Sequence, residues 1–252
     1  MLVSIVMPVY NTAAYLERTI RSIQAQTVWD WELLIINDAS TDASFEILSR
    51  LALSDPRLKI LNNPSRLGPA ASRNRGIEAA AADWIAFCDS DDLWLPGKLE
   101  RQLAAAWESG ADMLFSEAYC IDDKNNVLGR FSVPASLSRS RLLSGNAVKC
   151  STVMIRKDRL LRCPFEHDDL HEDYLCWMRL IDSGCRTLGI QEPLASYRLR
   201  QDSRSFQKFR SAAMMWKCYR VLGLPAWEKP ICFFRYGLNG LRRYRFLLHG
   251  FH

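Results

Sequence analysis

The chain has 252 residues, of which 48% are hydrophobic and 24% are charged, and its net charge is +5. A chain of this length can bury a large core without disulfides, in one domain or in a domain with an appendage. No stretch approaches the roughly 18–20 consecutive apolar residues of a membrane-spanning helix. The apolar run at residues 3–9 is too short for a signal peptide. We therefore expect a globular protein of the cytoplasm.

The first 92 residues alternate between short apolar segments and amphipathic ones. Strands are predicted at 2–10, 31–38, 58–63 and 83–89, and helices at 12–26, 40–52 and 68–81. Thr12 is placed to cap the first helix, and Gly68 with Pro69 marks the start of the third. Strands and helices that alternate at this spacing predict an α/β fold, with a mainly parallel sheet covered by helices on both faces.

After residue 92 the pattern becomes less regular. Helices are predicted at 97–109, with Pro96 at the first position, and at 172–184; strands are predicted at 111–122, 126–131, 151–157, 187–190 and 194–200. Two further helices, rich in aromatic and basic residues, are predicted at 204–222 and 228–248. Their aromatic residues favour packing against the protein over a lipid-binding face.

Positive charge is concentrated at the C-terminal end. Residues 200–252 contain eleven lysines and arginines and only two acidic residues. Such an end either meets an anionic membrane surface or forms a solvated basic face. Nucleic-acid binding is not expected, because no known reader motif is present.

Eight cysteines are spread along the chain, and no two form a C-x-x-C pair. Neither a zinc site nor a thioredoxin-like motif is therefore indicated. Several of these cysteines lie in apolar segments, as is typical of small core residues. We expect reduced thiols, which agrees with a cytoplasmic protein.

Three carboxylates, Asp89, Asp91 and Asp92, follow the fourth predicted strand directly. Like charges this close repel one another. In an open parallel sheet, ligands bind beyond the carboxyl ends of the strands, so Asp38 and Tyr10 should converge on the same crevice. A divalent cation would offset the repulsion, and oxygen ligands suit Mg²⁺ or Mn²⁺, which commonly share substrate phosphates. The sequence therefore predicts a nucleotide diphosphate that is bound through a metal.

Five segments together resemble the motif series of the inverting family-2 glycosyltransferases with the GT-A fold. They are SIVMPVYN, INDASTD, GPAASRNRG, FCDSDD and HEDYLCWMRL, in order along residues 3–200. The resemblance implies a Rossmann-like GT-A domain at 1–204, with a nucleotide-sugar half at 1–92 and an acceptor half at 93–204. Residues 205–252 match no general family motif and are expected to form a basic helical tail.

The resemblance also implies a donor site. Its expected residues are Pro8, Val9, Tyr10, Asn11, Asp38, Arg73, Asp89, Ser90 and Asp91. Tyr10 would stack on the base and Asp38 would accept a hydrogen bond from it. Arg73 would contact the nucleotide or its phosphates, Asp89 the ribose side, and Asp91 would ligate the metal beneath the diphosphate.

On the acceptor side the resemblance implies that Asp173 is the catalytic base, with Glu172 and His171 beside the acceptor or the preceding lid segment. A base opposite the leaving group suits attack by a sugar hydroxyl on the anomeric carbon. One base and one leaving-group clamp imply a single displacement with inversion. The start of a helix favours an anion, so we expect Asp173 to stay ionised.

Segments CSTVMIRK to HEDYLCWMRL and PLASYRLRQDSRS resemble bacterial enzymes that extend surface polysaccharides of the O-antigen, capsule or teichuronic type. This resemblance implies a UDP-linked donor and a lipid-linked saccharide acceptor at the cytoplasmic face of the inner membrane. The basic aromatic tail would then give peripheral membrane contact.

Three alternatives stay open on the sequence alone. A receiver-like signalling module also carries an acidic metal pocket, but it is about half this length and needs a lysine that we cannot place. A sugar nucleotidyltransferase would need a glycine-rich basic loop after the first strand, and PVYNTAAY has no glycine. A catalytically silent sugar-binding relative is disfavoured by the presence of both Asp91 and Asp173.

Overall fold

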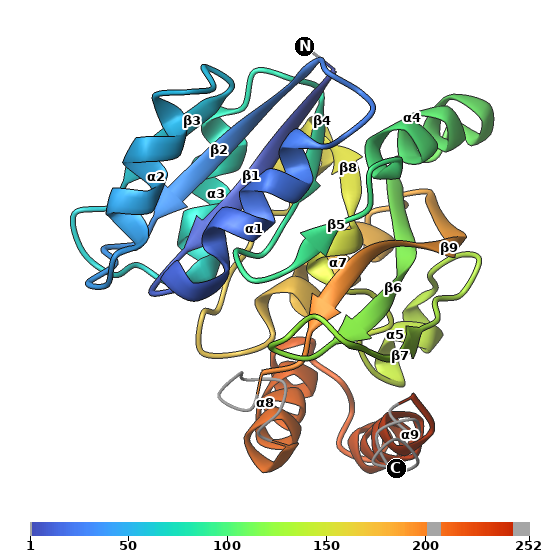
Figure 1. Ribbon diagram of the computed structural model, residues 1–252. Coiled ribbons are helices and arrows are strands. Elements are labelled where there is room, and N and C mark those ends of the chain that lie inside the picture. Colours follow the sequence, from blue (N-terminus) through green and yellow to red (C-terminus); the bar gives the residue numbers. More distant parts are fainter. Residues whose placement is uncertain (1, 201–207, 244–252) are drawn as a thin grey trace.

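The computed structural model describes residues 2–200 and 208–243, and the description below is confined to them. The strands form one nine-stranded sheet in the order β3-β2-β1-β4-β8-β6-β9-β5, with β7 paired to β6. Helices cover the sheet on both sides. Two further helices, the last two of the described chain, lie together below the sheet in this view (Figure 1). The α/β architecture predicted from the sequence is confirmed.

The N-terminal half contains the predicted alternation. Its elements are β1 (Val3–Val9), α1 (Ala13–Gln24), β2 (Trp31–Asn37), α2 (Ser44–Ala52), β3 (Leu58–Asn62), α3 (Pro69–Ala79) and β4 (Trp84–Phe87). The strands β3, β2, β1 and β4 are parallel. All seven residues of β2 are buried, because alternate side chains pack under α3 on one face and under α1 and α2 on the other.

The second half is built on the same sheet. Its elements are β5 (Leu93–Trp94), α4 (Lys98–Ser109), β6 (Met113–Ile121), β7 (Val127–Phe131), α5 (Arg139–Leu143), the 3₁₀ turn η1 (Cys150–Thr152), β8 (Met154–Arg156), α6 (Lys157–Arg162), α7 (Glu172–Asp182) and β9 (Thr187–Arg198). Because β8 pairs antiparallel with β4, the sheet is continuous across the predicted boundary at residue 92.

Several predicted boundaries are wrong for local reasons. The segment predicted as one strand at 151–157 is divided among η1, β8 and the start of α6. Conversely, the strands predicted at 187–190 and 194–200 are the single strand β9, which is irregular where Pro193 faces Glu117. Pro96 precedes its helix, because Lys98 N donates to the carbonyl of Leu95 and closes a turn first. Elements as short as β5, α5 and α6 show too little periodicity to be predicted.

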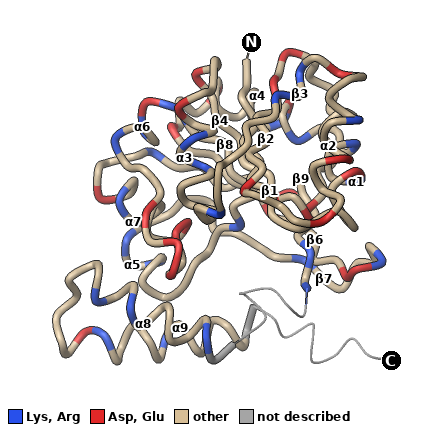
Figure 2. The backbone as a smooth tube through the Cα atoms, turned by 90° about the vertical axis from the view of Figure 1, so that its left-hand side faces the viewer, with Lys and Arg blue, Asp and Glu red and all other residues tan. Residues whose placement is uncertain are grey.

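The last two helices are α8 (Lys208–Val221) and α9 (Glu228–Arg243). They lie beside each other at one end of the molecule, with basic residues along both (Figure 2). Cys218, Tyr219 and Cys232 are buried in the core that also contains α7, and the hydroxyl of Tyr219 donates to the carbonyl of Leu143 at 2.8 Å. The helices therefore pack onto the half of the chain formed by residues 93–200. The outer parts of the predicted tail, 205–207 and 244–252, lie outside the described residues.

The aromatic residues of α8 and α9 do not all pack inward as predicted. Tyr219 is buried, whereas Phe234 is 67% exposed and Trp227, between the helices, is 71% exposed. All eight cysteines are free and buried, which agrees with the expected reduced thiols. None of the helices in the described part of the chain is both long enough and apolar enough to span a bilayer.

Candidate active site

A cavity of about 460 Å³ lies at the carboxyl ends of β1, β2 and β4. Of the predicted site residues, those that line it are Pro8, Val9, Tyr10, Asp38, Arg73, Asp89, Ser90, Asp91, His171, Glu172 and Asp173. The segment 144–150, α8 and α9 contribute further lining residues. The topology thus brings the donor-side and acceptor-side predictions to one place, while the role of each residue stays a prediction.

Asn11 is the predicted site residue that does not line this cavity. Its Oδ1 accepts from the backbone N–H of Thr41 at 2.8 Å, and its own backbone N–H donates to Ser40 Oγ at 3.2 Å. Its φ of 51° is left-handed, a conformation that asparagine tolerates better than most residues. Asn11 therefore ties the end of β1 to the loop after β2, which fixes the backbone of the neighbouring Tyr10.

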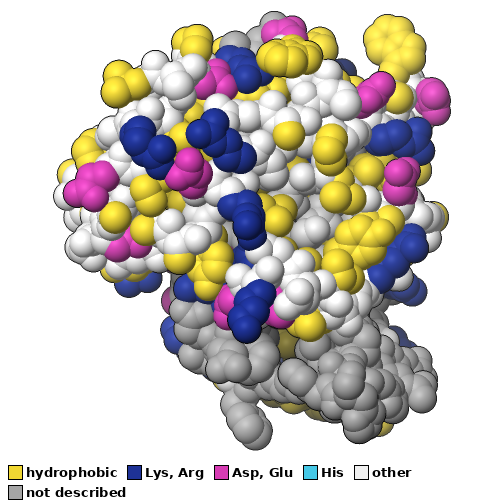
Figure 3. All heavy atoms as spheres, viewed as in Figure 1, with side chains coloured by type: hydrophobic (Ala, Val, Ile, Leu, Met, Phe, Trp, Pro, Cys, Tyr) yellow, Lys and Arg dark blue, Asp and Glu magenta, His cyan; other side chains and the backbone are white. Residues whose placement is uncertain are grey.

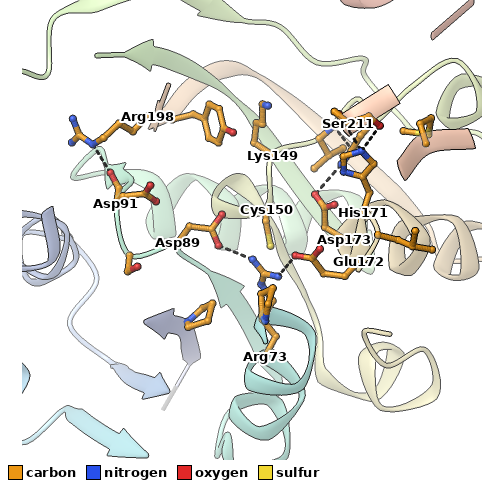
Figure 4. A pocket seen from close by; sticks show the side chains of 18 of the residues that line it. Arg73, Asp89, Asp91, Lys149, Cys150, His171, Glu172, Asp173, Arg198 and Ser211 are labelled. Atoms are coloured by element: carbon orange, nitrogen blue, oxygen red, sulfur yellow. Dashed lines mark hydrogen bonds and ion pairs between the residues drawn. The ribbon is translucent and has the colours of Figure 1, made fainter. Parts of the chain in front are cut away.

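Arg73, on α3, connects the two acidic parts of the cavity (Figure 4). Its Nη2 donates to Asp89 Oδ1 and its Nη1 to Glu172 Oε1, both at 2.8 Å. The side chain is only 5% exposed. A planar guanidinium can serve two carboxylates at once because its donors point in fixed, separate directions. Arg73 therefore fixes the distance between the loop after β4 and the start of α7.

The three carboxylates after β4 have different surroundings. Asp92 is 1% exposed and faces the protein, where its oxygens accept from Ser151 Oγ and from the backbone N–H of Arg198. Burial, with the charges of Asp91 and Asp89, raises the pKa of Asp92 well above its usual range. Asp92 therefore holds the loop in place, and only Asp89 and Asp91 face the cavity.

Asp91 is the residue expected to ligate a metal. Burial and the neighbouring charge of Asp89 raise its pKa, and Arg200 Nη1, 3.3 Å from Asp91 Oδ2, partly opposes this. The repulsion noted in the sequence is thus offset in part by two arginines, Arg73 and Arg200. A cation between Asp89 and Asp91 would relieve the remainder.

A magnesium or manganese ion fits these residues with help from its substrate. Among the residues that the structure describes, no three His, Cys, Asp or Glu side chains are grouped as metal ligands. Of the three carboxylates after β4, the two that face the cavity, Asp89 and Asp91, are hard oxygen donors, the type that both ions prefer. Such ions usually take one or two carboxylates and complete their coordination with phosphate and water oxygens. The site therefore suits an ion that is shared with a diphosphate.

The carboxylate of Asp38 is already engaged by the protein. It accepts from Asn63 Nδ2 at 2.7 Å and from the backbone N–H groups of Leu67 and Gly68 at 2.8 and 2.9 Å. These bonds anchor the loop that leads into α3. Asp38 shapes the cavity wall through this loop, and a base would have to approach its remaining lone pairs.

The ring of Tyr10 has a neighbour that the sequence did not suggest. The guanidinium of Arg66 lies 4.0 Å from the ring centroid, and both residues line the cavity. The polar lining residues that were missed include Asn146, Lys149, Ser211, Tyr236 and Asn239. All come from loops or from the last two helices, where no sequence motif marks them.

Asp173 lies in the first turn of α7, beside Glu172. Burial, and then the charge of Glu172, raise the pKa of Asp173, and His171 and Arg73 partly oppose this. Burial therefore influences the pKa of Asp173 more strongly than the helix dipole does, and its ionised state stays a prediction. A dipole contributes roughly 0.3–1 kcal/mol at a helix start, whereas full burial can raise a carboxyl pKa by several units. A raised pKa suits a general base.

His171 links α7 to the last two helices. Its Nε2 lies 3.1 Å from the carbonyl oxygen of Ser211 and 3.2 Å from Ser211 Oγ, which is 3.2 Å from the hydroxyl of Tyr236. These contacts place α8 and α9 directly against the start of α7, where Glu172 and Asp173 line the cavity (Figure 4).

Comparisons with known proteins agree with this arrangement. The model of glycosyl transferase family 2 matches residues 4–163. TuaG of Bacillus subtilis, named for teichuronic acid biosynthesis, is 31% identical over 96% of this chain and 97% of its own. WfgD of Escherichia coli, named as a UDP-Glc:alpha-D-GlcNAc-diphosphoundecaprenol beta-1,3-glucosyltransferase, is 34% identical over 97% and 96%.

Two solved structures share the fold. S. aureus TarS in complex with UDP-GlcNAc superposes with a TM-score of 0.74 and 18% identity, over 94% of this chain and 71% of that one. The mannosyltransferase PcManGT of Pyrobaculum calidifontis, with GDP-Man and Mn²⁺, gives 0.70 and 19%, over 93% and 68%. The receiver-like and nucleotidyltransferase alternatives are excluded by the family match. The chain belongs to glycosyltransferase family 2 and has the mixed α/β, Rossmann-like GT-A fold.

Proposed function

We propose that this protein is a metal-dependent, inverting hexosyltransferase that moves a sugar from a UDP-linked donor to a hydroxyl group of a lipid-linked saccharide during synthesis of a surface polysaccharide. One observation carries the proposal. A single cavity contains two carboxylate pairs, Asp89 with Asp91 and Glu172 with Asp173, and Arg73 bonds to one member of each. The relatives named for teichuronic acid and for a diphosphoundecaprenol-linked sugar support the acceptor class.

In the proposed reaction Asp173 accepts the proton of the acceptor hydroxyl as that oxygen attacks the anomeric carbon. Its raised pKa makes it a stronger base than an ordinary carboxylate. Asp173 and Asp91 lie on either side of Arg73 (Figure 4), so Asp173 would face the reacting carbon from the side away from the leaving group. Arg73 holds both walls at a fixed separation and contributes positive charge near the diphosphate. A metal ion held by Asp91, with Asp89 beside it, would supply further charge stabilisation of the leaving diphosphate.

The donor base is proposed to lie against Tyr10, between the walls formed by Pro8, Val9 and the loop that Asp38 anchors. Arg66 extends this surface, because its guanidinium already stacks on the Tyr10 ring. Ser90 lies between the two cavity-facing aspartates and would contact the ribose or the diphosphate.

We also infer peripheral contact with the cytoplasmic face of the inner membrane. The supporting feature is an apolar stripe on α9, formed by Ile231, Phe234, Leu238 and Leu241, all of which are exposed. Their spacing of three, four and three residues puts them on one side of the helix, and the cavity-lining Tyr236 lies on the other. An apolar stripe on a basic helix is typical of binding at a lipid interface.

Positive and negative side chains are interleaved on the face that carries α1 and α2 (Figure 3), which makes that face a suitable control. We expect Phe234→Ser with Leu238→Ser in the full chain to reduce co-sedimentation with vesicles that contain anionic lipid. Leu53→Ser, at a residue 91% exposed near α2, should not reduce it. Equal binding by all three proteins would count against membrane contact. Removal of the helices is a poor test, because they line the cavity.

The donor is tested by calorimetric titration with UDP, UDP-glucose, UDP-GlcNAc and GDP-mannose, with and without Mn²⁺, on the wild type and on Asp91→Ala. Metal-dependent binding of uridine nucleotides that is lost in the variant would support the proposal. Binding of GDP-mannose but of no uridine nucleotide would show that the donor is GDP-linked and not UDP-linked. Binding without transfer or hydrolysis would favour the silent relative, and no binding of any nucleotide would overturn the proposal.

A further inference from the structure

The carboxylate of Asp173 is held by two hydrogen bonds among the described residues. Its Oδ1 accepts from the backbone N–H of Tyr174 at 2.7 Å, and its Oδ2 accepts from Asn146 Nδ2 at 2.8 Å. The first bond lies within α7 and cannot fix the carboxylate relative to the rest of the cavity. Asn146 comes from the separate segment 144–150, so its bond does fix this relation.

The amide of Asn146 is oriented by a second contact. Its Oδ1 accepts from the backbone N–H of Val148 at 3.1 Å. If the amide were turned over, its oxygen would face the carboxylate of Asp173 and its NH₂ group would face an N–H donor, so both bonds would be lost. The local backbone therefore ensures that Asn146 presents a donor to Asp173.

The segment that carries Asn146 is held in turn by α9. Asn239 Nδ2 donates to the carbonyl of Ser144 at 3.1 Å. Gly145 has a φ of +121°, and a Cβ there would lie 3.2 Å from Cδ2 of Tyr236, which is closer than most real Cβ contacts. The backbone at Gly145 can therefore lie tightly against α9, and α9 sets the place of residues 144–146.

We propose that Asn146 is a positioning residue for Asp173, and that α9 sets its position through Asn239. This inference deepens the proposed function and rests on Asp173 being the base. It gives α9, which lies beyond the family-matched residues 4–163, a part in the reaction. The acceptor side of the site is thus completed by the C-terminal helices.

The expected effect follows from the charge of the base. A hydrogen bond donated to a carboxylate favours its ionised form, so loss of Asn146 should raise the pKa of Asp173 further. The titratable and charged groups that face Asp173 from the packed elements are Glu172, His171, Cys176, Arg73, Cys150 and Cys218. Burial raises the pKa of each of the three thiols, so they stay neutral near pH 7 and add no charge near Asp173.

The test follows the side-chain carboxyl ¹³C resonance of Asp173 against pH in full-length protein labelled at aspartate. The resonance is assigned by its loss in Asp173→Asn. We expect Asn146→Ala to raise the midpoint by about one pH unit, the size expected for a lost charged hydrogen bond. Asn146→Asp should raise it more, because it adds a second carboxylate. Asn239→Ala should raise it less, because it only loosens the segment.

The matched control is Asn74→Ala. Asn74 also makes two hydrogen bonds, to the backbone of Phe165, but it does not bond to Asp173. An unchanged midpoint in folded Asn146→Ala, or an equal shift in Asn74→Ala, would overturn the proposal. A shift in Asn146→Ala with none in Asn239→Ala would overturn the part assigned to α9. Because the titration needs no nucleotide, its result is separate from failure of the proposed function, which calorimetry detects.

Discussion

The two carboxylate pairs of the cavity have the same plan and different surroundings. In each pair one member bonds to Arg73: Asp89 on one side and Glu172 on the other. In each pair the second member, Asp91 or Asp173, has a pKa raised first by burial and then by its neighbour. The pairs differ in the groups that contact this second carboxylate.

Asp91 forms an ion pair with the guanidinium of Arg200, whose Nη1 lies 3.3 Å from Asp91 Oδ2. Asp173 instead accepts from neutral amide donors, one on Asn146 and one on the backbone. A carboxylate that faces positive charge suits a permanent anion that binds metal and diphosphate. A carboxylate held by neutral donors keeps its basicity and can take up a proton. The same residue type thus suits two different roles, and the difference comes from what surrounds each member.

The largest effect should follow from loss of the base. We expect Asp173→Asn to lower kcat by about 10²–10⁴-fold, the usual contribution of a general base, while nucleotide binding by calorimetry stays within about twofold. In the wild type, activity should fall as the pH drops through the raised pKa of Asp173, at a higher pH than for an ordinary aspartate. Loss of nucleotide binding in the variant would show that the two pairs do not act separately.

The second effect concerns the donor pair. Asp91→Asn removes the charge on the member proposed to bind metal, and we expect the Mn²⁺ concentration for half-maximal nucleotide binding to rise at least tenfold, which corresponds to about 1.4 kcal/mol. Asp173→Asn serves as the control, because it neutralises the other pair and should leave the Mn²⁺ requirement unchanged. Equal metal dependence in Asp91→Asn and the wild type would remove Asp91 from the metal site.

Arg73→Lys tests the bridge between the pairs. A lysine keeps the charge but lacks the planar fork, so it can serve one of Asp89 and Glu172 well and not both. We expect a loss of about tenfold in kcat/KM, with both nucleotide binding and turnover affected. Arg75→Lys is the control, since Arg75 lies on the same helix and bonds to Asn62 and Asn63, away from both pairs. A defect limited to nucleotide binding would place Arg73 with the donor pair alone.

The smallest effect on activity is expected from substitution of Lys98, which is buried beneath the loop after β4 and is linked through Gln102 to η1. Its Nζ donates to Gln102, which bonds to the carbonyl of Thr152 in η1. Burial lowers the pKa of Lys98 from its usual 10.5 to about 7. Because the unfolded chain binds this proton more tightly, the cost of burying Lys98 is complete below pH 7 and fades as the pH rises towards 10.

We therefore expect Lys98→Met to raise the unfolding temperature at pH 6 more than at pH 9.5, with little change in kcat. The measurement is thermal unfolding of both proteins at the two pH values. The lost bond to Gln102 opposes the gain by about 1 kcal/mol at either pH, so the difference between the pH values carries the information. A pH-independent effect would mean that Lys98 has an ordinary pKa.

The donor side could be predicted from the sequence because its residues follow buried parallel strands. Once β1, β2 and β4 are recognised, geometry alone brings Tyr10, Asp38 and Asp89 to one edge of the sheet. The family resemblance singled out Asp91 as the metal ligand, but the residue pattern alone could not show why Asp92 differs, because that difference depends on Ser151, which is 59 residues away from Asp92 and approaches only in the folded chain.

The acceptor side was less predictable. Asn146, Ser211 and Tyr236 come from loops and helices whose positions depend on long-range packing, and none lies in a pattern that marks chemistry. The raised pKa of Asp173 could not be predicted for the same reason, since its burial depends on segments that pack over the start of α7.

The contribution of α9 to the cavity also orders events during synthesis. Domains begin to fold from the N-terminal end as the chain leaves the ribosome. The edge of the sheet at the carboxyl ends of β1, β2 and β4 can form early, but Tyr236, Asn239 and Gly240 are made only after all of these strands. The cavity of a nascent chain therefore stays open on this side until residue 240 has emerged, and its lining is complete only once α9 has been made.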